Sequence, residues 1–252
     1  MNRIRLDEDW TLCQTKGNET SGRIFKLRHI PCQVHDALIQ EGIIENPNLK
    51  GFNNDRWIGK SDWRYEKIFS LEDISGSWNL ILEGLDTFAD IYFNGVRVAR
   101  NESAYMPCRI EGLTGVQKGE NRLRLEFKAP EQVLKEIELP QKYGEYVPDF
   151  CKARVFRSGF HDFSGPHPDL VRIGIYGHIW LEQVKTNGFR DITATVQMDP
   201  ALSWGKMISE ISYWDDSQEK ETLHYIIKDP AGRVVLEGEE NASHILEICL
   251  EE

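Results

Sequence analysis

Short runs of alternating apolar and polar residues recur along the chain, and they predict β-strands. In the clearest run, residues 122–128, Leu123, Leu125 and Phe127 share one face and charged residues share the other. Residues 62–71 alternate aromatic and polar side chains in the same way. Further strands are predicted at 78–84, 88–94, 96–100 and 173–184, the last with an interruption near Gly177.

Turn and helix signals separate these runs. The dipeptide Asn94-Gly95 predicts a tight hairpin, and residues 118–121 (KGEN) predict another turn. Short helices are expected at 34–40, ended by Gly42, and at 131–138, stopped by Pro140. Turn signals every 8–12 residues without helix–strand alternation indicate a β-sandwich or β-barrel rather than a (β/α)₈ barrel.

The composition changes after residue 184. Residues 185–188 predict a linker, and strand candidates follow at 189–197, 207–214, 223–228, 233–236 and 243–250. This second region resembles the first part of an immunoglobulin-like sandwich, a fold that takes about 100 residues. We therefore expect an all-β chain with a jelly-roll sandwich at 1–184 and a truncated immunoglobulin-like sandwich at 185–252, forming the N-terminal part of a longer protein.

Composition and charge narrow the function classes. The net charge is −11, from 30 basic and 41 acidic residues, which disfavours nucleic acid as a partner. No run approaches the ~20 apolar residues of a membrane span, so no membrane partner is expected. The first nine residues lack an apolar signal-peptide region, and the five cysteines are widely spaced. Together these features predict free thiols and a cytoplasmic protein.

Four segments, in this order, resemble the N-terminal region of glycoside hydrolase family 2, within it the β-mannosidase branch. Residues 30–35 (IPCQVH) resemble the family's VPGxVH motif, and residues 54–65 (NDRWIGKSDWRY) resemble WIGxxDWxY. Residues 82–95 (LEGLDTFADIYFNG) resemble FxGLDTxAxVxLNG, and the turn at 118–121 follows. The resemblance covers residues 3–184 well and the remainder more loosely.

This resemblance implies a modular enzyme. In the family a jelly-roll, galactose-binding-like sugar-binding domain precedes an immunoglobulin-like sandwich and a catalytic (β/α)₈ barrel. Retaining glycosidases need two carboxyl groups about 5–5.5 Å apart, and the family takes both from the barrel. The chain is therefore expected to hold no catalytic residue and no cofactor. Its expected partners are a terminal sugar, its own barrel and, as a further option, copies of itself.

Residues 152–166 (KARVFRSGFHDFSGP) resemble the β-mannosidase loop RKAQxxFGWDWGP, which helps to shape the sugar subsite. Asp162 falls on the family's Asp, while His161 and Phe163 stand where the family has two Trp, and Ser164 is inserted. A carboxylate accepts sugar hydroxyls and a flat aromatic ring stacks on a pyranose. The alternative is a polar turn in which Asp162 caps a backbone N–H.

Other motifs have simpler interpretations. Asn101-Glu102 matches the family's acid/base dipeptide but lies in the sandwich, so we interpret it as structural. His161, His167 and His178 are too widely spaced to predict a metal site.

The tryptophans divide between core and surface. Trp63 and Trp180 are predicted to lie in the core rather than on a sugar platform. Trp57, beside Asn54, Asp55 and Arg56, is a candidate contact for substrate, barrel or a neighbouring subunit.

The leading hypothesis is thus the non-catalytic N-terminal portion of a β-mannosidase-like hydrolase. Autonomous carbohydrate-binding module and purely structural scaffold remain as alternatives, and β-galactoside and β-glucuronide remain as alternative substrates.

Overall fold

The structure is a computed structural model that describes residues 2–46, 55–138, 172–184, 188–201, 203–214 and 222–251. The chain forms two compact units, Met1–Gln183 (unit 1) and Val184–Glu252 (unit 2). Each unit has its own sheets and its own apolar core. None of the described helices has the length and apolar character needed to span a membrane.

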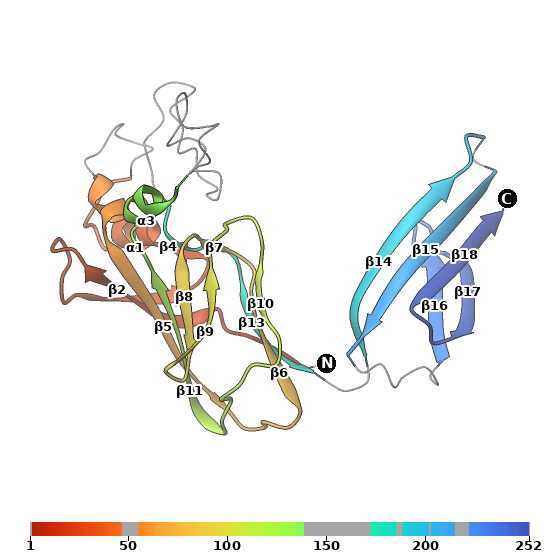
Figure 1. Ribbon diagram of the computed structural model, residues 1–252, viewed down its shortest axis with the longest axis horizontal. Coiled ribbons are helices and arrows are strands. Elements are labelled where there is room, and N and C mark those ends of the chain that lie inside the picture. The colour runs from red at the N-terminus through yellow and green to blue at the C-terminus, as the bar shows by residue number, and fades with distance from the viewer. Residues whose placement is uncertain are drawn as a thin grey trace. The chain divides into compact units, whose positions relative to one another are not determined.

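Unit 1 is a sandwich of a six-stranded and a four-stranded sheet (Figure 1). The six-stranded sheet has the order β3-β2-β5-β11-β8-β9, formed by Ile24–His29, Glu8–Lys16, Asp62–Leu71, Gly119–Phe127, Ala89–Phe93 and Val96–Asn101. The four-stranded sheet has the order β1-β13-β6-β10, formed by Asn2–Arg5, Ile179–Val184, Ser77–Leu82 and Cys108–Ile110. A small third sheet has the order β4-β12-β7, formed by Cys32–Gln33, Gly174–Ile175 and Leu85–Asp86.

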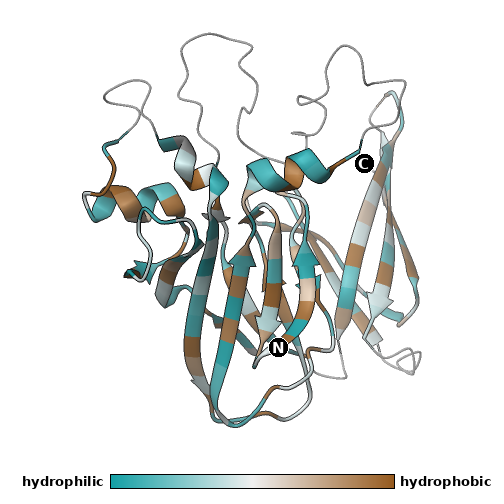
Figure 2. Cartoon of the chain, turned by 60° about the vertical axis from the view of Figure 1, so that its left-hand side comes forward, coloured by the Kyte–Doolittle hydropathy of each residue, from teal (hydrophilic) through white to brown (hydrophobic). Residues whose placement is uncertain are grey.

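Successive side chains of a strand point to opposite faces, so the apolar ones fill the space between the two large sheets. Figure 2 shows this alternation as hydrophobic and hydrophilic bands along the strands. Leu123, Leu125 and Phe127 are buried to within 1% exposure on β11, as predicted. On the neighbouring strand β5, Trp63 and Tyr65 are fully buried. The predicted core position of Trp63 is therefore confirmed.

Among the described residues, three short helices lie at one end of unit 1: α1 (Val34–Gln40), the 3₁₀ helix η1 (Asp55–Lys60) and α3 (Pro130–Glu136) (Figure 1). Helix α1 has the predicted bounds, and Gly42 follows it with a φ of 67°. Helix α3 starts at Pro130, which suits the first helical turn, and stops two residues before the predicted end because Ile137 is already extended.

The predicted hairpin at Asn94-Gly95 is confirmed. Both residues have positive φ, 47° and 85°, the geometry of a type I′ turn between β8 and β9. The Asn94 side chain accepts the Arg122 N–H at 2.7 Å and donates to Asn121 Oδ1 at 2.9 Å. Asn121, only 1% exposed, also donates to the carbonyl oxygen of Gln117 at 2.7 Å. The predicted turn at 118–121 is thus tied to the hairpin by a buried amide network.

Several strands lie outside the sequence predictions, namely β1, β2, β3, β4, β7 and β10. Four of them have four residues or fewer, too short for alternation to be recognised. Strand β2 starts with two acidic residues, and Asp9 has a φ of 53°, so its apolar period begins only at Trp10. The first two residues of β2 therefore do not show the alternation that would predict a strand.

Unit 2 contains a three-stranded sheet of β14 (Phe189–Met198), β15 (Trp204–Tyr213) and β18 (Ile245–Glu251), and a two-stranded sheet of β16 (Thr222–Lys228) and β17 (Val234–Asn241). All five predicted strands are present, and β17 extends five residues beyond its predicted end. The core is small and consists of Ile211, Leu223, Ala242, Leu246 and Ile248. Every residue of β14 is exposed.

The buried amide network predicts a measurable contribution to stability. Asn121→Ala should lower the free energy of unfolding by about 1–3 kcal/mol, because it removes three hydrogen bonds between a buried side chain and the backbone of Gln117 and Gly119. Urea unfolding followed by tryptophan fluorescence reports this change, since most tryptophans lie in unit 1. Asn18→Ala, at an exposed position, is the reference, and equal midpoints for the two variants would contradict the prediction.

The burial of His35 predicts that the folded state loses stability in acid. Burial lowers its pKa to about 4, and the nearby Arg172 acts in the same direction while Asp36 opposes it. The unfolded imidazole titrates near pH 6.5, so between these values the unfolded state binds a proton that the folded state does not. The free energy of unfolding should therefore fall by up to about 3 kcal/mol as the pH drops from about 6.5 to about 4.

The variant His35→Leu should flatten this pH dependence, measured as urea midpoints between pH 7 and pH 4.5. His29→Gln, at an exposed position, should leave the slope of the wild type unchanged. A His35→Leu protein with the wild-type slope would rule out His35 as the source.

Candidate functional site

The predicted substrate loop lies outside the described residues. This applies to Asp162, His161 and Phe163, and also to His167. Their predicted roles stay predictions.

The described residues on either side of that loop are firmly held. Helix α3 precedes the loop, and Leu134 packs with Phe88 in a small apolar cluster of its own. After the loop, Ile173 is fully buried and its carbonyl oxygen accepts the Val34 N–H at 2.9 Å. Strand β12 then pairs with both β4 and β7. The described elements before residue 139 and after residue 171 are thus each held by contacts within unit 1.

Trp57 is half-buried in η1 and packs against the core. Its ring centroid lies 6.0 Å from that of Trp63, with a 41° angle between the planes. Its carbonyl oxygen accepts the Ser61 hydroxyl at 2.8 Å. One side of the indole therefore serves packing, and substrate contact through its exposed part stays a prediction.

Residues 85–87, part of the family-like segment 82–95, take part in hydrogen bonds that hold the neighbouring backbone in place. Asp86 is fully buried, and Thr87 Oγ1 donates to its Oδ1 at 2.6 Å. The carbonyl oxygen of Thr87 accepts Asn101 Nδ2 at 2.7 Å, and the same amide donates to the Ser103 carbonyl oxygen at 3.0 Å. Asn101 is thus occupied with holding backbone. Its neighbour Glu102 is exposed and pairs with Arg100 at 3.1 Å, which supports the structural interpretation of the dipeptide.

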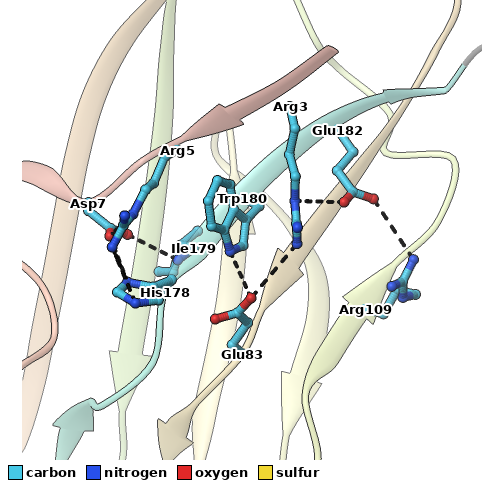
Figure 3. A network of polar contacts seen from close by, with 9 residues as sticks. All are labelled: Arg3, Arg5, Asp7, Glu83, Arg109, His178, Ile179, Trp180 and Glu182. Carbon is cyan, nitrogen blue, oxygen red and sulfur yellow. Dashed lines mark hydrogen bonds and ion pairs between the residues drawn. The ribbon is translucent and has the colours of Figure 1, made fainter. Parts of the chain in front are cut away.

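Trp180 does not lie in the core, contrary to the prediction. Its indole is half-buried on the outer face of the four-stranded sheet (Figure 3), because its two neighbours along β13 point inward and are fully buried. The guanidinium carbons of Arg3 and Arg5 lie 4.1 and 5.4 Å from the ring centroid. The indole N–H donates to Glu83 Oε1 at 2.8 Å. With two cations over its ring, Trp180 does not offer a free platform for a sugar.

The same face carries a chain of ion pairs (Figure 3). Glu182 is 5% exposed and lies between Arg3, at 2.8 Å, and Arg109, at 3.9 Å. Asp7 accepts the Ile179 N–H at 3.2 Å and contacts His178 Nδ1 at 2.7 Å. Arg5 also forms an ion pair with Asp7, so the two buried carboxylates of this face, Asp7 and Glu182, are both paired, and the network joins strand β1 to β13.

Sequence reasoning did not identify this network. The alternation Arg3-Ile4-Arg5 was the available signal, but a four-residue strand is too short to stand out. His178, weighed as a metal ligand, pairs with a carboxylate and a guanidinium instead. Within the described parts of the chain, no group of three His, Cys, Asp or Glu side chains could hold a metal ion.

Curated relatives of the chain include proteins that are named β-mannosidases. The chain is 27% identical over 157 residues to a protein named "Probable beta-mannosidase" from Caenorhabditis elegans, covering 60% of this chain and 17% of that protein. It is 24% identical over 261 aligned positions to "Beta-mannosidase B" from Thermothelomyces thermophilus, covering 90% and 30%. It is 34% identical over 108 residues to the Mus musculus "Beta-mannosidase", covering 41% and 12%. The chain thus corresponds to less than a third of these relatives.

Solved structures share the fold. A β-D-mannosidase from Dictyoglomus thermophilum aligns with a TM-score of 0.76 and 23% identity, over 99% of this chain and 31% of that one. An uncultured Clostridium sp. β-glucuronidase aligns with a TM-score of 0.64 and 16% identity, over 99% and 39%. A family model described as "Glycosyl hydrolase 2 galactose-binding domain-like" matches residues 10–177. This match covers well over half of the chain, which therefore belongs to the glycosyl hydrolase 2 galactose-binding domain-like family.

Proposed function

We propose that the chain is the N-terminal, non-catalytic portion of a glycoside hydrolase that releases terminal β-linked mannose. The observation that carries this proposal is the family match over residues 10–177 together with relatives that are named β-mannosidases. The family-like segment 82–95 also has a structural role in unit 1. Leu85 and Asp86 form β7, which pairs with β12, and the Thr87 carbonyl oxygen accepts a hydrogen bond from Asn101 at the end of β9.

The proposed reaction belongs to the parent protein. A retaining glycosidase uses one carboxylate as nucleophile and a second carboxyl group as acid and base, about 5–5.5 Å apart. In this proposal a barrel domain beyond the chain supplies that pair, and the chain supplies the rim of the sugar pocket. β-Galactosides and β-glucuronides are the alternative substrates.

Asp162 is proposed to bind the terminal sugar through two of its hydroxyls. His161 and Phe163 flank it, and the exposed edge of Trp57 extends the same rim. Charge-assisted hydrogen bonds are directional, so Asp162 needs a fixed position. The packing of α3 and the pairing of β12 support this role, because they hold the chain on either side of residues 139–171.

Three finer assignments belong to the same proposal. Unit 2 is an incomplete immunoglobulin-like sandwich, supported by its three-stranded and two-stranded sheets around one small core. The protein acts in the cytoplasm, supported by the free thiols of Cys13, Cys32, Cys108 and Cys249. The parent is also proposed to assemble with copies of itself, for which the exposed strand β14 offers a surface.

A scaffold role is the second candidate function. The Arg3 and Arg5 guanidinium groups over Trp180 favour it over an autonomous module that binds sugar on an aromatic platform. A scaffold predicts that mutations change assembly with the barrel and leave sugar affinity unaffected.

The parent protein tests the substrate role of Asp162. Asp162→Asn should lower kcat/KM for an aryl β-mannoside about 10- to 100-fold, because a charged hydrogen-bond acceptor is lost in a desolvated pocket. Glu102→Gln is the matched carboxylate control and should keep wild-type activity, since Glu102 is exposed and pairs with Arg100 on the surface. Equal losses in the two variants would overturn the assignment of Asp162.

The isolated chain should not hydrolyse aryl β-mannoside, β-galactoside or β-glucuronide, because the carboxylate pair is assigned to the barrel. Turnover of any of these by the purified 252-residue chain would overturn the non-catalytic role.

A further inference from the structure

A charged cavity lies beside α3, on residues other than those of the predicted substrate loop. Its volume is about 300 Å³. Six charged side chains line it: Lys16, Arg100, Lys128, Asp62, Asp90 and Glu136. We propose that this cavity binds a neutral saccharide ring, as a site separate from the sugar pocket proposed around Asp162.

The cavity forms where several strands of the six-stranded sheet end. Asp90 and Arg100 are register partners at the start of β8 and the end of β9. Asp62 begins β5, and Lys128 directly follows β11. Alternation turns these side chains outward, away from the core. Helix α3 then supplies Glu136 as the opposite wall.

Hydrogen bonds hold two sides of the cavity in place. Asp62 Oδ1 accepts the Ala129 N–H at 2.8 Å, which fixes this carboxylate against the start of α3. Lys16 Nζ donates to Gln132 Oε1 at 2.6 Å, and Gln132 Nε2 donates to Glu136 Oε1 at 3.3 Å. A bound molecule would therefore meet groups that are already ordered, which lowers the entropic cost of binding.

Charge balance selects the class of ligand. Three cations and three carboxylates line the cavity, so their formal charges cancel. A net anion or a net cation would meet as much repulsion as attraction. A sugar hydroxyl accepts from an ammonium or guanidinium and donates to a carboxylate, so a neutral polyol pairs with both signs.

The remaining lining and the size fit a single ring. Ala129 and Val133 provide a small apolar surface for the C–H groups of a pyranose. The volume lies at the lower end of the ~300–1,000 Å³ typical of small-molecule sites, which suits one ring rather than an oligosaccharide. The cavity is open, so we expect millimolar affinity.

Titration of the ¹⁵N-labelled 252-residue chain tests this site. The probes are methyl β-D-mannoside, methyl β-D-glucoside and the anionic methyl β-D-glucuronide, at low salt. At least one neutral glycoside should shift the Ala129 and Gln132 amides, more strongly than the glucuronide. Absence of these shifts up to 100 mM neutral glycoside, or tighter binding of the glucuronide, would overturn the proposal.

Two variants alter the charge balance in opposite directions. Glu136→Gln leaves one cation in excess and should raise the affinity ratio of glucuronide to neutral glycoside about ten-fold. Lys128→Met leaves one carboxylate in excess and should lower this ratio by a similar factor. An unchanged ratio in both variants would contradict the charge argument.

Helix α3 also provides matched controls. Glu131→Gln removes a negative charge and Lys135→Met removes a positive charge, both on α3 and outside the cavity lining, and both variants should keep the wild-type ratio. Asp162→Asn should leave the amide shifts intact, which separates this site from the sugar pocket proposed for the parent. Loss of the shifts in Asp162→Asn would assign the binding to that loop and overturn the proposal.

Discussion

The closure of unit 1 depends on one close approach, that of strand β12 to the buried ring of Tyr65. The Tyr65 hydroxyl donates to the Cys32 carbonyl oxygen at 3.0 Å, and a Cβ at Gly174 would lie 2.3 Å from the same hydroxyl. Gly174 also has a φ of 128°, a conformation open to glycine. Only glycine, which has no side chain, lets β12 run at this position between β4 and β7. These two pairings hold the chain in place just after residue 171.

This closure places the last strand of unit 1 beside the first. Strand β13 pairs with β1, and Trp180 stands opposite Arg5 in that register. The two faces of β13 are stabilised by different interactions. The inward face is stabilised by the hydrophobic burial of Leu181 in the core. The outward face is stabilised by the cation–π contact of Trp180 and by the ion pair of Glu182.

Local charge patterns differ from the net charge of the chain. The sequence carries −11, yet the lining of the α3 cavity is balanced, and the two buried carboxylates on the outer sheet face, Asp7 and Glu182, each have an arginine partner. Net charge therefore says which partners the chain repels at a distance, whereas the proposed ligand follows from the arrangement at one site.

Local signals were sufficient for much of the fold. The Asn94-Gly95 turn, helix α1, the inward face of β11 and the family resemblance could all be predicted, because each depends on residues close in sequence. The outward turn of Trp180, the buried amide of Asn121 and the cavity beside α3 could not, because each depends on strand order and register. Alternation tells which residues share a face, and only tertiary pairing decides whether that face meets the core, a guanidinium group or solvent.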